Sequence, residues 1–161
     1  MTAETYNPPE SLSGLQSKGM MAAVAGAALA GVGFAMTGLD RFYEAYLVAW
    51  VFWTGLGLGS LALLMVHHLT GGAWGVVIRR ILEAATRTLP VMAILGLPIL
   101  AGMGHLYHWT HADVVASDPV IADKVAYLNV PFFIGRYVFY FAVWSFLAMR
   151  LSAWSAEQDR T

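Results

Sequence analysis

The chain has 161 residues, of which 58% are hydrophobic and only 12% are charged. Soluble domains carry about a quarter charged residues, so this chain has too few water-favouring groups for an ordinary soluble fold. The net charge of −1 excludes a basic field that would recruit nucleic acid, and the absence of cysteine excludes disulfides, thiolate-held iron–sulfur clusters and cysteine-ligated zinc within this chain.

Four stretches are apolar and long enough to cross the core of a bilayer, which needs roughly 20 residues of helix. Every backbone N–H and C=O group must be satisfied within the chain at that depth, and the two-residue alternation of a membrane barrel is missing. We therefore predict an all-α integral membrane fold with four transmembrane helices, as part of a larger helical bundle. The four spans cover approximately residues 19–38, 45–66, 88–104 and 130–149.

Small residues recur at four-residue spacing in the first two spans. Ala22, Gly26 and Ala30 do so in the first span, and Gly55 and Gly59 in the second. Lipid tails are as apolar as leucine, so helices in a membrane associate through close packing, which small residues allow. This pattern favours a packed bundle over a single-span anchor.

Aromatic residues are concentrated in the fourth span, VPFFIGRYVFYFAVW. This span is bulky, and we expect part of it to face lipid or a large partner. Tryptophan and tyrosine are also enriched at membrane–water interfaces, so the tryptophans are candidates for interfacial belts. They are Trp50, Trp53, Trp109, Trp144 and Trp154.

Lysine and arginine positions predict the orientation. With four crossings of the transmembrane region 19–149, the N-terminal segment 1–18, the loop after the second span and the C-terminal segment 150–161 share one side. That side holds six of the nine basic residues, so the positive-inside rule places both termini in the cytoplasm. The six are Lys18, Arg79, Arg80, Arg87, Arg150 and Arg160, against Arg41, Lys124 and Arg136 on the other side.

The loop after the second span, MVHHLTGGAWGVVIRRILEAATRTLP, holds a histidine pair and three arginines. We expect the arginines on a short amphipathic connector between two spans. Two interpretations stay open: these side chains mark the cytoplasmic boundary and contact lipid headgroups, or they have a direct functional role. The candidates are His67, His68, Arg79, Arg80 and Arg87.

Three further histidines, His105, His108 and His111, follow the third span at a spacing of three. On a continuing helix two of them would share a face and could ligate a metal. No clear ligand pattern accompanies them, so we expect a solvated interface and predict no metal site. A bilayer thickness of about 30 Å separates them from His67 and His68, which excludes a haem held by both groups.

Arg136 lies about six residues inside the fourth span. A guanidinium at that depth is costly unless it meets a partner, water, or an anionic or carbonyl ligand. It either extends along its aliphatic stem to the headgroups or belongs to a polar pocket. Tyr46, His105 and Asn129 are expected near the same depth and complete that candidate pocket. A quinone headgroup, with two carbonyl oxygens, would suit such donors in an apolar slot.

Three stretches, HHLTGGAWGVVIRRILEAATRTLP, KVAYLNVPFFIGRYVFYF and WSAEQDRT, resemble the ActF-type membrane subunit of bacterial alternative complex III. That subunit is quinone-binding and belongs to the polysulfide-reductase membrane-subunit family. The resemblance covers approximately residues 15–161. It implies a non-catalytic membrane subunit of a quinol:cytochrome c oxidoreductase, or of one with another electron carrier, in the bacterial inner membrane. The subunit would scaffold the complex and contribute to binding of a quinone, such as menaquinone, or to proton conduction.

The resemblance also implies partners. They would be the paired quinol-binding membrane subunit, the iron–sulfur subunit, the haem c subunits, lipids and quinol, with no nucleic acid. No cofactor would be bound covalently here, and haem c and the iron–sulfur clusters would belong to partner subunits. His67, His68 and the loop arginines would lie on the cytoplasmic side, for proton uptake or lipid contact, and Arg136 would enter the bundle from the periplasm. Family members have more than four spans and continue past WSAEQDRT, so we expect this chain to need further helices, from a longer subunit or from neighbours.

Two functions of other classes stay open: a small oligomeric transporter or channel, and an assembly anchor without a ligand. Interrupted helices favour a transporter, and Pro90 and Pro98 interrupt the third span. However, no internal repeat is visible, and no aspartate or glutamate falls at mid-span. These absences favour a subunit over an independent transporter.

Overall fold

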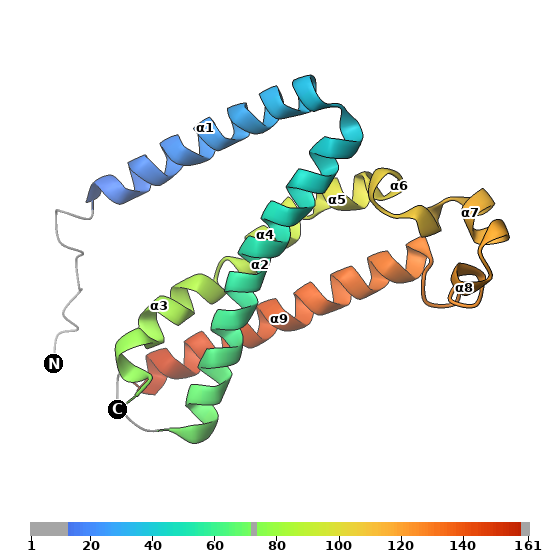
Figure 1. Cartoon of the computed structure of the whole chain (residues 1–161). Coiled ribbons are helices and arrows are strands. Elements are labelled where there is room, and N and C mark those ends of the chain that lie inside the picture. Colours follow the sequence, from blue (N-terminus) through green and yellow to red (C-terminus); the bar gives the residue numbers. More distant parts are fainter. Residues whose placement is uncertain (1–12, 72–73, 159–161) are drawn as a thin grey trace, which may run out of the picture. The chain divides into compact units, whose positions relative to one another are not determined.

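The computed structural model describes residues 13–71 and 74–158. Within these ranges every regular element is helical (Figure 1), and four helices are long and apolar enough to cross a membrane. The predicted all-α membrane fold with four spans is confirmed, and the chain is a multi-pass membrane protein. The spans are Gly14–Thr37, Leu39–Thr70, Val77–Ala101 and Val130–Gln158.

The chain divides into two compact units, and the first ends at Phe42. Its described part holds α1 (Ser13–Thr37) and the beginning of α2 (Leu39–Thr70). Gly38 separates the two helices with φ of 79°, a conformation that glycine adopts without a steric penalty. The rings of Phe34 and Phe42 meet edge-on at 5.1 Å across this turn.

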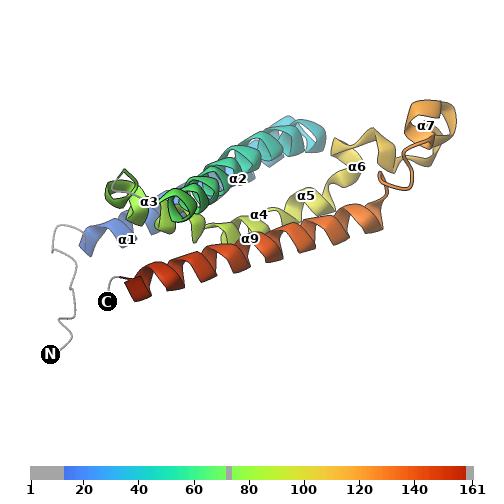
Figure 2. The same ribbon diagram turned by 90° about the horizontal axis from the view of Figure 1, so that it is seen from below.

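The second unit begins at Tyr43 and contains the remaining helices. In both views α9 lies alongside α4, and it also packs against α3 (Figures 1 and 2). The helices that follow α2 in this unit are α3 (Val76–Thr86), α4 (Leu89–Leu95), α5 (Leu97–Ala101), α6 (Met103–Leu106), η2 (His108–Thr110), α7 (Ala112–Ser117), α8 (Pro119–Ala122) and α9 (Val130–Gln158).

The third span begins earlier than the sequence predicted. Arg87 and Thr88 stay in the right-handed helical region, so α3 leads into α4 almost without a break. The helix that bears the arginines, α3, is thus continuous with the third span. The exposed side chains of Val77 and Ile81 supply its hydropathy. Hydropathy averaged over a window places the start of the span after the arginines, whereas the helical backbone is continuous across Arg87 and Thr88.

The buried core lies where α2, α3, α4 and α9 meet. Gly57 lets α4 approach α2, because a Cβ atom there would lie 2.9 Å from Leu89 Cδ2. The close contact in the second span is therefore made by Gly57 and not by the predicted pair Gly55 and Gly59, where a Cβ would meet nothing within 4 Å. The core residues are Leu61, Leu64, Leu82, Leu89, Ala148 and Leu151.

The interruption of the third span at Gly96 is stabilised by aromatic side chains of the neighbouring helices. Trp50 Nε1 donates to the carbonyl oxygen of Met92 at 2.8 Å. Tyr137 Oη donates to Ala93 O at 2.6 Å, and Tyr46 Oη donates to Leu95 O at 2.6 Å. Met92 O also accepts from the backbone N–H of Gly96 at 2.9 Å, whereas Ala93 O and Leu95 O accept no recorded backbone bond within the described residues. Inside a bilayer no water can take these carbonyls, so the two tyrosines allow the helix to break at this depth.

The segment between the third and fourth spans is held by aromatic stacking. The rings of Tyr107, Trp109 and Phe133 lie 5.5 to 5.7 Å apart. Burial raises the pKa of Tyr107 above its ordinary value, so this phenol stays protonated at neutral pH. The segment is thereby attached to the first turn of α9, close to Arg136.

Candidate functional site

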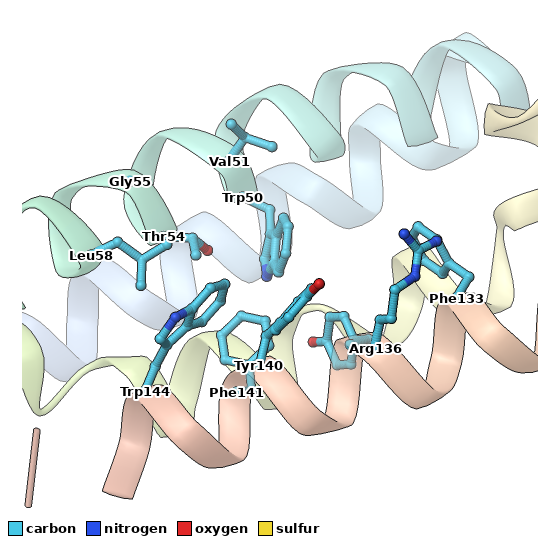
Figure 3. A pocket seen from close by; sticks show the side chains of 11 residues that line it. Trp50, Val51, Thr54, Gly55, Leu58, Phe133, Arg136, Tyr140, Phe141 and Trp144 are labelled. Atoms are coloured by element: carbon cyan, nitrogen blue, oxygen red, sulfur yellow. The ribbon is translucent and has the colours of Figure 1, made fainter. Parts of the chain in front are cut away.

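An aromatic slot of about 370 Å³ lies between α2 and α9 (Figure 3). Its volume falls in the range of small-molecule sites, and such sites usually combine apolar walls with a few polar groups. In Figure 3, Trp50 and Thr54 point from α2 toward α9, and Phe141 and Trp144 point back toward α2. The lining residues are Trp50, Val51, Thr54, Gly55, Leu58, Phe133, Arg136, Tyr137, Tyr140, Phe141 and Trp144.

The walls of the slot follow from helical periodicity. Phe133, Tyr137 and Phe141 recur every four residues on α9, so they share one helix face. Trp50 faces them from α2, with its ring centroid 6.2 Å from that of Tyr137 and 5.8 Å from that of Phe141. Because the polar atoms of Trp50 and Tyr137 are hydrogen-bonded to α4, these two rings have fixed positions.

Thr54 contributes a hydroxyl group to the slot. The residue is 5% exposed, and its Oγ1 has no hydrogen-bond partner among the residues that the structure describes. Ser60 and Thr70 on the same helix differ, because each donates to the carbonyl oxygen four residues earlier. A buried hydroxyl without a partner costs about 1–3 kcal/mol, so that of Thr54 can gain from a ligand in the slot.

Arg136 lies between the slot and a second pocket of about 760 Å³, and it lines both. Its guanidinium carbon sits 3.7 Å above the centroid of the Tyr127 ring and 4.9 Å from that of Phe132. Nη2 donates to Tyr127 O at 3.3 Å, while Nε is buried and has no partner in residues 13–71 and 74–158. No carboxylate within the described residues forms an ion pair with it. Aromatic faces thus stabilise the cation, and most of its N–H groups stay available.

Asn129 shares this second pocket with Arg136 and caps α9. Its Oδ1 accepts from the backbone N–H of Phe132 at 2.9 Å. Its Nδ2 donates to the carbonyl oxygens of Val125 and Ala126. The sequence predicted Asn129 and Arg136 in one polar pocket, and both line this second pocket. However, the side-chain amide of Asn129 is already hydrogen-bonded to backbone groups.

Tyr46 and His105, the other two residues of the predicted polar pocket, line neither of these two pockets. Tyr46 donates to Leu95 O, as described above, and His105 stacks on Tyr43 at a centroid distance of 5.4 Å. A Cβ atom on Gly102 would overlap the ring of Tyr43, so this part of the chain is closely packed. Both residues therefore hold the interrupted third span against α2.

The two histidine groups lie at opposite ends of α2. His105 contacts Tyr43 at the beginning of that helix, whereas His67 lies about 36 Å further along it, at 1.5 Å per residue. The expected separation is thus present. The helix does not continue through His105, His108 and His111, because the backbone becomes extended at Tyr107. No group of three or more His, Asp or Glu residues in the described part of the chain is placed to hold a metal ion.

The basic residues of the loop meet an acidic residue that the sequence analysis missed. Glu83 has a side chain that is only 3% exposed, and its carboxylate pairs with Arg80 Nη1 at 2.8 Å and with Arg79 Nε at 3.8 Å. The spacing could have predicted these ion pairs, since Glu83 follows the two arginines by four and three residues on one helix. Arg87 is exposed at the end of α3.

The two histidines at the end of α2 make packing and hydrogen-bond contacts. His67 is 8% exposed, and its ring meets that of Trp74 edge-on at 5.4 Å. A Cβ atom at Gly75 would overlap the His67 ring, so glycine is required there. His68 Nδ1 donates to Leu64 O at 2.8 Å. These contacts attach the beginning of α3 to the end of α2.

Comparison with protein-family models finds no match to this chain, and comparison with curated proteins finds none either. A functional proposal therefore depends on the geometry of the slot and on the resemblance of the three sequence stretches.

Proposed function

We propose that this chain is a non-catalytic membrane subunit of a quinol-oxidising complex of the alternative complex III type, and that its aromatic slot binds a quinone. The observation that carries the proposal is the composition of the slot. It has aromatic walls, one guanidinium from Arg136 and one unpaired hydroxyl from Thr54. The resemblance of the three stretches to the ActF-type subunit supports it independently.

The slot fits the shape and chemistry of a quinone headgroup. Flat rings pack favourably on aromatic side chains, and Trp50, Tyr137 and Phe141, which contact one another at centroid distances of 4.8 to 6.2 Å, present such surfaces to the slot. Quinone carbonyl oxygens accept hydrogen bonds, and Arg136 and Thr54 are donors on opposite helices. When bound, quinol would supply two electrons and two protons. The residues of this chain would bind and orient it and exclude water.

Onward electron transfer would be the task of partner subunits. The chain has no cysteine to hold an iron–sulfur cluster, and its histidine groups lie at opposite ends of α2. The proposal therefore assigns haem c and iron–sulfur clusters to neighbouring subunits. It gives this chain a scaffolding role and a share in quinone binding or proton conduction.

We place the chain in a bacterial inner membrane with both termini in the cytoplasm. Leu82 of α3 and Leu151 of α9 belong to one buried cluster, so the arginines near them lie at one end of the bundle. These are Arg79 and Arg80 on α3 and Arg150 on α9. A basic end of this kind favours the cytoplasmic side.

An oligomeric transporter is the second candidate, and the interrupted third span is the observation that favours it. In transporters, the freed carbonyls of a broken helix coordinate ions. Here Met92, Ala93 and Leu95 already accept hydrogen bonds from aromatic side chains. The broken helix therefore favours a transporter, but its hydrogen-bonded carbonyls are less available to coordinate an ion.

Purification of the tagged chain from its native membranes tests the proposed class. We expect haem c and iron–sulfur subunits to co-purify with it. In the intact complex, we expect both Arg136→Leu and Thr54→Val to raise the apparent KM for quinol roughly tenfold, because each removes one hydrogen-bond donor. Arg150→Leu on the same helix is the matched control. Normal quinol oxidation by both slot variants would favour a ligand-free anchor, and a homo-oligomer without redox partners would favour a transporter.

A further inference from the structure

We infer that the second pocket beside Arg136 binds the phosphate of an anionic phospholipid. This pocket opens at the beginning of α9 and has a volume of about 760 Å³. The inference does not require a quinone in the slot, although the slot on the other side of Arg136 is lined by the same residue. The lining residues are Ala126, Tyr127, Asn129, Pro131, Phe132, Gly135, Arg136, Phe139 and Tyr140.

The two arginines of α9 show where the helix meets the membrane boundary. Arg136 and Arg150 bracket an uncharged stretch and are about 21 Å apart at 1.5 Å per residue. The guanidinium of Arg136 lies over Tyr127, beyond the beginning of the helix, and that of Arg150 lies over Trp154, towards its end. Both cations thus extend away from the middle of the membrane, which brings that of Arg136 to headgroup depth.

The cation at Arg136 has capacity for an anion. A guanidinium has five N–H donors, and the structure records one bond from it, to Tyr127 O. Nε is buried without a partner, and no carboxylate in the described part of the chain pairs with Arg136. A phosphate accepts two parallel hydrogen bonds from such a group, in the geometry that makes arginine a phosphate ligand.

The surroundings of the pocket favour a lipid over free phosphate. Tyr127, Phe132 and Tyr140 form its aromatic sides, as expected at the headgroup level. From the pocket towards the middle of α9, Phe139, Val143 and Phe146 share one helix face and are all exposed. This apolar stripe leads from the phosphate position towards the membrane interior, where an acyl chain would lie.

Native mass spectrometry of the delipidated full chain tests the inference, with dioleoyl phosphatidylglycerol as the probe and dioleoyl phosphatidylcholine as the neutral comparison. We expect preferential binding of phosphatidylglycerol, reduced roughly tenfold by Arg136→Gln through loss of a charge-assisted bidentate contact. Arg150→Gln removes an equal charge from the same helix and is expected to retain that binding. Asn129→Asp keeps the oxygen that caps Phe132 N–H, loses the two bonds that Nδ2 donates to Val125 O and Ala126 O, and adds negative charge to the pocket, so it is expected to weaken binding as well.

Several outcomes would overturn the inference. They are equal binding of the two lipids, equal loss with Arg136→Gln and Arg150→Gln, or displacement of the lipid by inorganic phosphate alone. If circular dichroism showed Arg136→Gln to be misfolded, Asn129→Asp would decide: unchanged lipid binding would contradict the site. Quinol oxidation is measured separately in the intact complex with Thr54→Val, a residue outside this pocket. The two proposals can therefore fail independently.

Discussion

The hydroxyl group of Tyr137 donates a hydrogen bond of 2.6 Å to the carbonyl oxygen of Ala93. This bond joins the centre of α9 to the last turn of α4, just before the interruption at Gly96. Trp50 and Tyr46 make equivalent bonds from α2. The broken third span is therefore held from both sides, and two of the three side chains that hold it, Trp50 and Tyr137, also form part of the slot wall.

Tyr137→Phe should destabilise the protein by about 0.6–1.7 kcal/mol, the range measured for hydrogen bonds between membrane helices. The ring stays in place, but Ala93 O loses the partner that α9 supplies. Unfolding in micelles, followed by circular dichroism during titration with a denaturing detergent, measures this. Tyr140→Phe is the matched control, because the structure records no hydrogen bond from its hydroxyl to any described residue. Equal stability of the two variants would refute the role assigned to Tyr137.

Gly96→Ala should destabilise the protein by about 1–3 kcal/mol through overpacking. A Cβ atom at this position would overlap Tyr137 Oη and lie 3.0 Å from Trp50 Cζ2. Gly59→Ala is the control, because a Cβ there meets nothing within 4 Å, and alanine in a helix is favoured by up to about 1 kcal/mol. The same detergent titration should give shifts of opposite sign. A stabilising effect of Gly96→Ala would show that the contact is not as described.

Glu83→Gln should loosen α3, because the buried carboxylate balances two arginines. We expect a loss of about 1.5–3 kcal/mol, as for hydrogen bonds to charged groups. Limited trypsin digestion of the purified protein should then cut faster after Arg79 and Arg80. Glu157→Gln, at an exposed position near the end of α9, provides the comparison and should leave the cleavage rate unchanged. Unchanged cleavage in Glu83→Gln would mean that the ion pairs do not hold α3.

Cysteine labelling can test the proposed orientation without first removing native cysteines, because the chain has none. Glu157→Cys and Asp113→Cys replace exposed side chains on α9 and α7. With a membrane-impermeant maleimide, we expect Glu157→Cys to react only in inverted vesicles and Asp113→Cys only in intact cells. The reverse pattern would invert the orientation. Labelling of both from one side would contradict four crossings.

The existence of the helices could be predicted because the relevant physics is local. Each span is recognised from about 20 apolar residues and from the need to satisfy its own backbone. Boundaries were less predictable: α9 continues to Gln158, beyond the predicted boundary at residue 149. Hydropathy marks the hydrocarbon core, whereas a helix can continue into the headgroup region and beyond.

The candidate site was predictable only in part. Arg136 could be singled out because one charge in an apolar run is visible in the sequence. Asn129 shares its second pocket, but Tyr46 and His105 bind and stack elsewhere. Equal depth along parallel helices does not specify which side of a helix a residue occupies, and the rotation of each helix depends on contacts distant in sequence.

By itself the sequence determined the helical class, the four crossings and the isolation of Arg136, since each follows from the transfer of local groups between water and lipid. Tertiary structure alone decided that Trp50 and Tyr137 hold a broken helix, that Thr54 is left without a hydrogen-bond partner in a slot, and that Glu83 is buried. Those facts depend on which faces of separate helices meet. In a membrane those faces are selected by close packing and hydrogen bonding, because burial from lipid gives little preference for one apolar face over another.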